Sequence, residues 1–253
     1  MINIIYLVPP IFFLISFLFS MLGMGGSQLY IPILFWMGMD FKTEAIPLGM
    51  LLNVINSSSA AFTYWTKGLI EWKIAIPFGL SMVILAPVGT ALNISLPTKP
   101  VIFIFALFTA SAAILMLSGW KPKGGNLSPR KRTMLGISCG SILGFFAGLI
   151  GRGGGSFVVP LLYIAGLEAK IAAATSSMVV TFSGSSSFVS HIATAAHPNL
   201  IIWLLCVFAV LLGSQIGSRF MVKKLKSKSV KFTFGIILLG VAALLIIKDV
   251  IFK

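Results

Sequence analysis

Charged side chains are scarce in this sequence, and their scarcity excludes a water-soluble domain. Only 9% of the 253 residues are charged, whereas 58% are hydrophobic and the mean hydropathy is +1.05. Soluble domains carry about 25% charged residues, and a chain of this length could not bury so much apolar surface in water. Because the apolar runs are too long and continuous for the alternating strands of a barrel, we predict an all-α polytopic membrane protein.

Acidic residues are the rarer of the two charged classes, and none lies deep in an apolar run. The five acidic residues lie at or near the ends of runs: Asp40, Glu44, Glu71, Glu168 and Asp249. Carboxylates within membrane segments commonly mark proton relays and cation sites. Their absence from the middle of the runs disfavours a cation carrier and favours the transport of an anion.

Several other signatures are missing as well. The two cysteines, Cys139 and Cys206, lie in apolar runs without a pairing motif, so packing is their expected role. Residues 1–22 lack a basic start and a small-residue cleavage site, and we expect a first membrane segment there, not a signal peptide. Neither glycine-rich motif has the spacing of a nucleotide-binding fingerprint, and we predict no cofactor and no metal.

Ten apolar runs divide the chain. They cover residues 4–22, 26–39, 43–65, 72–93, 99–119, 133–150, 153–167, 169–194, 199–222 and 229–252. Most reach the ~20 residues that cross ~30 Å of hydrocarbon. The second and seventh are short, begin at a glycine-rich motif and contain Pro32 or Pro160, so we expect them to be broken, tilted or re-entrant. We therefore predict about eight to ten membrane-embedded helices.

The chain contains an internal repeat at an offset of 128 positions. Without any gap, residues of the first half match identical residues of the second. These are Gly23, Gly25, Gly26, Pro32, Gly38, Lys42, Ala45, Met50, Ser57, Ser58 and Ser59, with mates Gly151, Gly153, Gly154, Pro160, Gly166, Lys170, Ala173, Met178, Ser185, Ser186 and Ser187. A glycine cluster, a proline and a serine triplet do not readily coincide at one offset by chance. We predict two transmembrane repeats, residues 1–119 and 133–253, joined by a basic cytoplasmic linker at 120–132.

The basic residues predict how the two repeats are oriented. Each repeat has an odd number of segments, so the halves are inverted relative to each other if every run crosses. With the linker in the cytoplasm, 14 of the 19 Lys and Arg residues fall inside, including those of the loops 121–132 and 223–231. Both termini then lie outside. Because the basic residues lie mostly in short connections, the net charge of +14 indicates membrane orientation and not nucleic-acid binding.

The two glycine-rich motifs form the first candidate site. They comprise Gly25, Gly26, Ser27 and Gln28 in the first repeat and Arg152, Gly153, Gly154, Gly155 and Ser156 in the second. Freed N–H groups at a helix start, which carries roughly half a positive charge, bind anions, and Arg152 could clamp one. The alternatives are close helix packing for the glycines and snorkelling to the headgroups for Arg152, whose repeat mate is Met24.

Polar residues of the third and eighth runs form the second candidate site. They are Asn53, Asn56 and Ser57 in the third run and Thr175, Ser176 and Ser177 in the eighth. An unsatisfied amide in hydrocarbon costs several kcal/mol, so the two asparagines should face a partner or a wet cavity. The serines could instead bond to the i−4 carbonyl of their own helix.

A serine–histidine pair is the enzyme hypothesis that the sequence allows. Ser186 precedes His191 by five residues, which places the two about 140° apart around a helix. They could not readily pair, so hydrolysis is disfavoured and we predict that the chain is not an enzyme. For His191 we expect a packed or interfacial position.

Four motifs together carry a family resemblance. They are Gly-x-Gly-Gly-Ser before Pro32, its longer copy before Pro160, the hydroxyl run Thr175–Ser177, and Gly213 with Gly217. With these motifs the chain resembles the TauE/SafE family of sulfite and organosulfonate exporters over essentially its whole length.

The resemblance implies export of a small sulfur-containing anion across a bacterial inner membrane. The expected partners are that small anionic substrate and the lipid bilayer, with alternating access as the mechanism. A cytoplasm-negative potential favours the exit of an anion by ~2.3 kcal/mol per charge per 100 mV, so no coupling ion is required. An anion channel, or a carrier of a different small anion, is the alternative.

Overall fold

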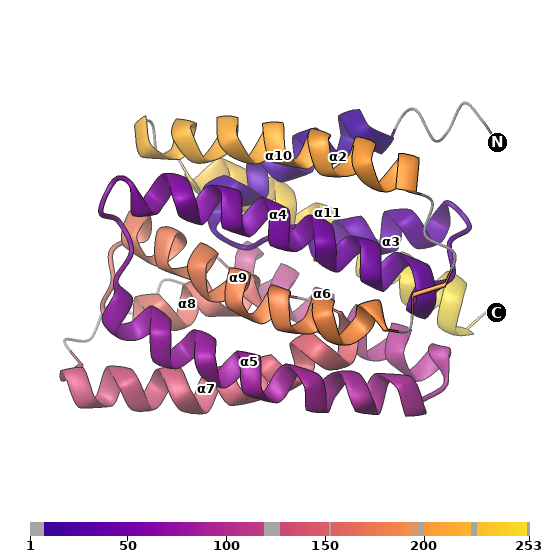
Figure 1. The fold of residues 1–253 in the computed structure, drawn as a ribbon, viewed down its shortest axis with the longest axis horizontal. Helices are drawn as coiled ribbons and strands as arrows, with labels where there is room; N and C mark the ends of the chain where they lie inside the picture. The colour runs from indigo at the N-terminus through magenta and orange to yellow at the C-terminus, as the bar shows by residue number, and fades with distance from the viewer. Residues whose placement is uncertain are drawn as a thin grey trace.

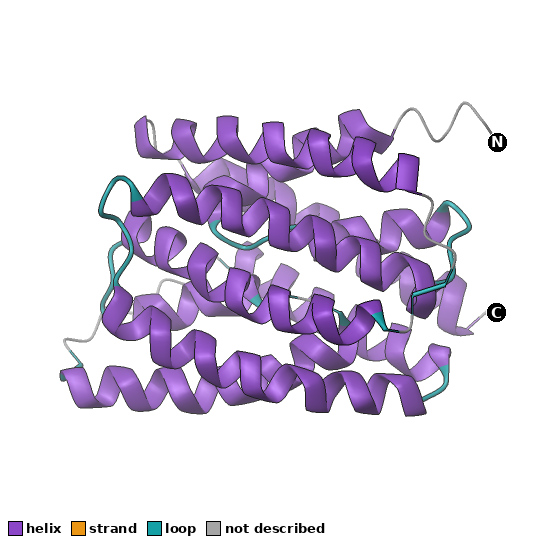
Figure 2. Cartoon of the chain, viewed as in Figure 1, coloured by secondary structure: helices purple, strands orange, loops and turns teal. Residues whose placement is uncertain are grey.

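All the elements that the structure describes are helices, and most lie side by side along one axis (Figures 1 and 2). The structure is a computed structural model and describes residues 8–118, 127–151, 153–193, 195–196, 200–223 and 227–251, with the backbone alone at 227–235. The α-helices are α2 (Val8–Leu22), α3 (Ser27–Trp36), α4 (Ile46–Trp65), α5 (Trp72–Ser95), α6 (Thr98–Leu117), α7 (Pro129–Ile150), α8 (Gly155–Ile164), α9 (Ala169–Ile192), α10 (Leu200–Lys223) and α11 (Ser227–Leu244). Two π-helical turns, η1 (Phe41–Ala45) and η2 (Leu245–Ile251), precede α4 and follow α11. Each predicted apolar run therefore contains a helix, which confirms the all-α prediction.

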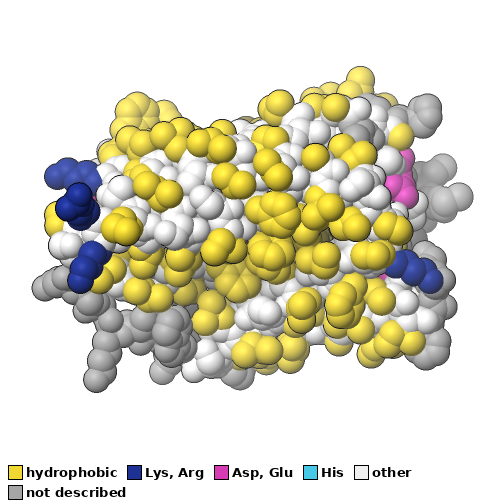
Figure 3. Space-filling view, turned by 90° about the horizontal axis from the view of Figure 1, so that it is seen from below, with side chains coloured by type: hydrophobic (Ala, Val, Ile, Leu, Met, Phe, Trp, Pro, Cys, Tyr) yellow, Lys and Arg dark blue, Asp and Glu magenta, His cyan; other side chains and the backbone are white. Residues whose placement is uncertain are grey.

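The outer surface is apolar between two charged ends, as lipid requires. Figure 3 shows hydrophobic side chains over the middle of one face and charged side chains at its two ends. On α10, the side chains of Ile201, Leu204 and Phe208 are all exposed, an arrangement that favours contact with lipid over contact with water. Five stretches are long and apolar enough to cross a membrane, namely Phe41–Trp65, Trp72–Ser95, Thr98–Leu117, Pro129–Ile150 and Leu200–Lys223. The chain is a polytopic membrane protein.

Helix α7 begins inside the predicted linker. Its first residue is Pro129, and Arg130, Lys131 and Arg132 follow in the first turn. Proline is favoured at this position because the N–H that it lacks would have no partner within the helix. Residues 119–126 lie outside the described residues, so the division into two repeats stays a prediction.

Helices α4 and α9 pack against each other in the middle of the bundle (Figure 1). On one side of this pair, α2 packs against α10, and α10 also packs against α4. On the other side, α7 packs against α5, and α5 also packs against α9. Helix α6 packs against α11. The polar residues of the third and eighth apolar runs, which form the second candidate site, lie on α4 and α9. This arrangement therefore places them in the interior.

Glycines allow α5 and α7 to approach closely. A methyl group at Gly148 would lie on the carbonyl oxygen of Ala86 and 2.9 Å from the backbone nitrogen of Thr90. Gly148→Ala should therefore push the two helices apart and lower the free energy of unfolding by about 1–3 kcal/mol, measured as a lower midpoint of thermal unfolding in detergent. Gly240→Ala is the control, because nothing lies within 4 Å of a methyl group there. Equal midpoints for the two variants would contradict the close packing.

Helices α3 and α8 each begin after a glycine-rich break, as the sequence predicted. Each has 10 residues, which at 1.5 Å per residue span ~15 Å, about half the hydrocarbon thickness. Neither helix can cross the bilayer alone. Gly25 and Gly154 adopt φ values of +68° and +69°, a region that residues with a side chain rarely adopt. The turns at the two breaks therefore depend on glycine.

Asp40 caps the π-helical turn before α4. Its Oδ1 accepts hydrogen bonds from the backbone N–H of Thr43 at 2.8 Å and of Lys42 at 3.1 Å. Although partial burial opposes the shift, these bonds and the Lys42 charge hold the pKa of Asp40 below its usual 3.8. The carboxylate therefore contributes its full stability above pH 3.8, and that contribution is lost as the pH falls through the lower pKa of the folded state.

Removing this cap should destabilise the protein measurably. We expect Asp40→Ala to lower the free energy of unfolding by about 1 kcal/mol at neutral pH, and Asp40→Asn to change it little, because asparagine caps as well as aspartate. Thermal unfolding midpoints in detergent measure both variants. An equal loss in the two would show that the charge, and not the cap, is what Asp40 provides.

Candidate functional site at the two helix breaks

The two glycine-rich motifs contact each other in the interior. Gly153 N–H donates to Ser27 Oγ at 3.3 Å, and Ser156 Oγ donates to Gln28 Oε1 at 2.6 Å. Gln28 and Ser156 are equivalent positions of the repeat, 128 residues apart. Every described residue of the two predicted motifs is buried. The structure therefore brings the predicted residues of both repeats into one site.

Asn53 of α4 caps the first break. Its Oδ1 accepts from the N–H of Gly26 at 3.0 Å and from that of Ser27 at 3.4 Å. These are among the amides at the start of α3, which lack partners within the helix, and Gly26, the N-cap residue, has no side chain to satisfy them. Asn53 thus links the middle of α4 to the start of α3.

The repeat mate of Asn53 does not cap the start of α8. The N-cap residue of α8 is Gly154, which has no side chain to cap the helix. Thr181, the repeat mate of Asn53, donates instead to the Ser177 carbonyl of its own helix at 2.8 Å. The first amides of a helix carry the positive end of its dipole. The second break therefore lacks the counterpart of the cap that Asn53 provides at the first break.

The Nδ2 group of Asn53 is a buried donor without a hydrogen-bond partner among the described residues. It lies beside the second break, because methyl groups at Gly153 and Gly184 would be 2.5 and 3.0 Å from it. A buried donor left unsatisfied costs about 1–3 kcal/mol, and proteins rarely retain one without a reason. Asn53 Nδ2 and the first amides of α8 form a set of hydrogen-bond donors. The described residues of the two motifs include no carboxylate. Such a set suits a small anion.

Asn56 lies one turn further along α4 and faces α2 and α10, not the breaks. Its Oδ1 accepts from Ser16 Oγ at 2.9 Å, and its carbonyl accepts from Ser214 Oγ at 2.7 Å. Its Nδ2 is buried without a partner in the described part of the chain. Asn56 therefore belongs to a polar contact between three helices next to the site.

The predicted hydroxyl groups divide into two kinds. Ser57 and Ser177 donate to the i−4 carbonyls of their own helices, at 2.8 and 3.1 Å. Ser176 Oγ donates to the Gly23 carbonyl at 2.6 Å and so touches the first break. Thr175 Oγ1 accepts from the N–H of Glu71, before α5, at 3.0 Å. Of this group, only Ser176 contacts a glycine-rich motif directly.

Two residues singled out in the sequence carry or could carry a positive charge. Arg152 lies outside the described residues, so its role as a clamp stays a prediction. His191 is buried, and its Nε2 donates to the Gly148 carbonyl at 2.7 Å, in agreement with the packed position expected for it. Ser186 Oγ donates to the Val83 carbonyl of α5 at 2.8 Å and does not pair with His191.

Sequence reasoning missed Ser183 as a neighbour of the site. Its Oγ donates to the Gly153 carbonyl at 3.2 Å, and its side chain is fully buried. The signal was present in the sequence, because Ser183 lies seven residues after Ser176 and two turns of a helix place both on one face. Only the position of Gly153 against that face was hidden.

Comparison with known proteins identifies this chain as a transporter. The family "Sulfite exporter TauE/SafE" matches residues 8–245. A probable membrane transporter protein of Xylella fastidiosa is 27% identical over 237 residues, which cover 90% of each chain. Another, of Methanocaldococcus jannaschii, is 25% identical over 225 residues, 82% of each chain. The Arabidopsis thaliana sulfite exporter TauE/SafE family protein 1 is 33% identical over 100 residues, 38% of this chain and 22% of that protein.

These matches confirm the resemblance carried by the glycine motifs and place the chain among transporters, not enzymes. The family match covers both glycine-rich breaks and every helix from α2 to α11. This protein belongs to the sulfite exporter TauE/SafE family of membrane transporters.

Proposed function

We propose that the protein exports a small sulfur-containing oxyanion, such as sulfite or an organosulfonate, by alternating access. The observation that carries this proposal is the buried Nδ2 of Asn53, which has no partner among the described residues and lies beside Gly153 at the second break. Amide donors at a helix start compensate a negative charge without a counter-ion and select an oxyanion over a cation. The clamp predicted from the sequence at Arg152 would add a positive charge to the second motif.

Inverted repeats are the architecture that alternating access of this kind uses. The helix packing supports them, because the offset of 128 exchanges equivalent helix pairs. The repeat maps the contact between α2 and α10 onto that between α7 and α5, and the contact between α4 and α10 onto that between α9 and α5. It maps the α4–α9 contact and the α6–α11 contact onto themselves.

Two equivalent lysines support the inversion. Lys42 Nζ donates to the Ile94 carbonyl near the end of α5 at 3.3 Å, and Lys170 Nζ donates to the carbonyl of Val222, the repeat mate of Ile94, near the end of α10 at 3.2 Å. Lys42 lies in η1, directly before α4, whereas Val222 lines a pocket with Lys67, just after the other end of α4. The same contact thus recurs at opposite ends of α4, as two halves related by an axis in the membrane plane require.

The distribution of charge suggests the direction of transport. The positive-inside bias assigns the end with Lys67 and Lys223 to the cytoplasm. A cytoplasm-negative potential then drives an anion outward by ~2.3 kcal/mol per charge per 100 mV. Because the described residues of the two motifs include no carboxylate, the site needs no bound cation to hold the anion.

Efflux from proteoliposomes under an imposed potential tests the proposal. Vesicles with the purified protein are loaded separately with sulfite, thiosulfate, sulfoacetate or taurine, and valinomycin with a K⁺ gradient makes their interior negative. We expect the anions to leave faster than taurine, whose charges cancel at neutral pH, and the efflux of the anions to slow when the potential is collapsed. Efflux equal to that from protein-free vesicles for all four solutes would contradict the proposal.

A further inference from the structure

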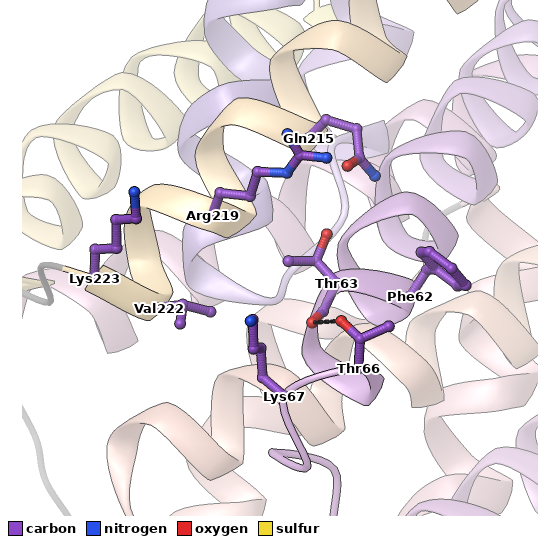
Figure 4. A pocket seen from close by; sticks show the side chains of 8 residues that line it. All are labelled: Phe62, Thr63, Thr66, Lys67, Gln215, Arg219, Val222 and Lys223. Atoms are coloured by element: carbon purple, nitrogen blue, oxygen red, sulfur yellow. Dashed lines mark hydrogen bonds between the residues drawn. The ribbon is translucent and has the colours of Figure 1, made fainter.

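A pocket lies between the ends of α4 and α10, away from the helix breaks. Its volume is ≈ 490 Å³, and it is lined by Phe62, Thr63, Thr66, Lys67, Gln215, Arg219, Val222 and Lys223. Figure 4 shows Thr63, Thr66 and Lys67 on the α4 side facing Gln215, Arg219 and Lys223 on α10. Three of the eight lining residues are cations, and none is a carboxylate.

The three cations that line this pocket repel one another unless an anion lies between them. The ends of α4 and α10 offset part of this repulsion through the negative ends of their dipoles. The side chains of Lys67, Arg219 and Lys223 are all exposed, so a soluble ion can reach them. Arginine offers an oxyanion a planar fork of N–H donors, and lysine offers it a compact positive charge.

The equivalent positions of the repeat do not carry this cluster. At the offset of 128 the three cations Lys67, Arg219 and Lys223 correspond to uncharged residues. Those residues are Ala195, Ala91 and Ser95. The offset matches the glycine cluster, Pro32 and the serine triplet, but these three charges have no charged counterparts. The three cations therefore distinguish the side from which an anion is collected.

A polar seam between α4 and α10 leads inward from the pocket. Thr63 lines the pocket and accepts from Ser218 Oγ, on α10, at 3.1 Å. Gln215, also in the lining, donates through Nε2 to Ser59 Oγ at 2.7 Å. Thr63, Ser59 and Ser218 are buried, so hydrogen bonds between side chains close the seam in this conformation.

The seam continues to the candidate site at the breaks. Ser214 Oγ donates to the Asn56 carbonyl, and Asn56 precedes Ser59 by one turn and follows Asn53 by another. Residues 56, 59 and 63 share one face of α4, and Asn53 lies one turn further along the helix. From Asn53 to Trp65, the last residue of α4, the helix rise is ~18 Å at 1.5 Å per residue.

We infer that the pocket of Lys67, Arg219 and Lys223 is a second oxyanion site, which collects the anion before it enters the α4–α10 seam. As a loading site it rests on the proposed function, because the seam leads to the break site proposed above. Parting of α4 from α10 would open the seam and connect the two sites. The charge at one end alone would then make loading more effective from that end.

Equilibrium binding of sulfite to the purified protein in phosphatidylcholine nanodiscs tests the pocket. Asn53→Asp removes the donor at the breaks, so the remaining binding reports the pocket. In that background we expect Arg219→Gln to weaken sulfite binding about tenfold or more, because it removes a charge-assisted bond. Lys73→Gln is the control, since Lys73 is an exposed cation at the start of α5, near the same end, and does not line the pocket.

Flux through the single variant Arg219→Gln adds a second readout. We expect the half-saturating sulfite concentration to rise about tenfold when sulfite is presented on the pocket side, with the maximal rate unchanged, and to stay unchanged on the other side. Inside-out and right-side-out membrane vesicles separate the two sides. An identical response on both sides would overturn the loading role.

The outcomes separate this inference from the proposed function. Absence of flux in the wild-type protein would reject export, while loss of binding on Arg219→Gln would still establish the oxyanion pocket. Two outcomes would reject the pocket alone if the wild-type protein transports sulfite. One is no sulfite binding in Asn53→Asp, and the other is equal binding in the Arg219→Gln and Lys73→Gln variants. Repeating the measurement in phosphatidylglycerol nanodiscs identifies the source of the oxyanion. Competition there shows that a headgroup phosphate occupies the pocket, and unchanged binding shows that a soluble anion does.

Discussion

Replacement of Asn53 with aspartate should lower the rate of sulfite flux roughly 10- to 100-fold, because a charge-assisted hydrogen bond is worth about 1.5–3 kcal/mol. Aspartate keeps an oxygen that accepts from Gly26 N–H and Ser27 N–H, so the cap at the start of α3 survives. It replaces the Nδ2 donor beside Gly153 with a second oxygen. The variant therefore removes the proposed contact with the anion and keeps the cap at the start of α3.

Two further variants make this result interpretable. Ser57→Ala lies one turn along α4 and removes a hydroxyl that bonds only to carbonyls of its own helix among the described residues, so its flux should equal that of the wild type. Asn53→Leu removes the cap as well as the donor and should also lower the midpoint of thermal unfolding. Initial rates in proteoliposomes and unfolding midpoints measure all three. Wild-type flux in Asn53→Asp would remove Asn53 from the site.

Gly153→Ala should be nearly as severe, although it adds one carbon atom. The added methyl group would lie 2.5 Å from Asn53 Nδ2 and 2.9 Å from Val180 Cγ1. It would occupy the space beside the donor and press on α9, and overpacking of this kind costs about 1–3 kcal/mol. We expect the flux of sulfite to fall about tenfold or more, measured as the initial rate at saturating substrate.

The control for this variant is Gly136→Ala on α7. The nearest heavy atoms to a methyl group there belong to Phe78 and are 3.5 Å away, an ordinary contact. Its flux and its unfolding midpoint should match those of the wild type. If Gly136→Ala and Gly153→Ala lower the flux equally, helix packing in general, and not the break, limits transport.

The order of the helices followed directly from the sequence. Long apolar runs specify membrane helices because the bilayer leaves no other partner for backbone N–H and C=O groups. The repeat went further and identified Gln28 and Ser156 as equivalent residues, which the structure joins by a hydrogen bond. The proposed symmetry between the repeats requires equivalent residues near its axis to meet, and for this reason a sequence offset could anticipate a contact in space.

The different roles of the two breaks could not be predicted. Asn53 and its mate Thr181 are both polar, but the amide of Asn53 reaches the neighbouring helix start, whereas the shorter Thr181 side chain bonds to its own helix. The outcome depends on side-chain length and on the distance between helices, and hydropathy reports neither. The same limit hid the contact of Ser183 with Gly153.

The basic pocket shows a further limit of the sequence. Lys67 and Arg219 lie 152 positions apart, and the sequence assigned both to one side of the membrane by charge alone. That α4 and α10 are neighbours, and that Gln215 bonds to Ser59 between them, depends on how the two repeats pack. A count of charges predicts the side of the membrane on which a residue lies, but it does not show which charged residues line the same pocket.

Exchange of labelled sulfite is the most direct test of an alternating-access oxyanion carrier. Proteoliposomes loaded with millimolar unlabelled sulfite are diluted into a trace of labelled sulfite with the membrane potential clamped at zero. A carrier that reorients with its substrate predicts transient accumulation of label inside above its external concentration, saturation with external sulfite, and loss of both in Asn53→Asp. Label that only equilibrates, at a rate linear in sulfite concentration and indifferent to internal sulfite, would contradict alternating access and describe a channel.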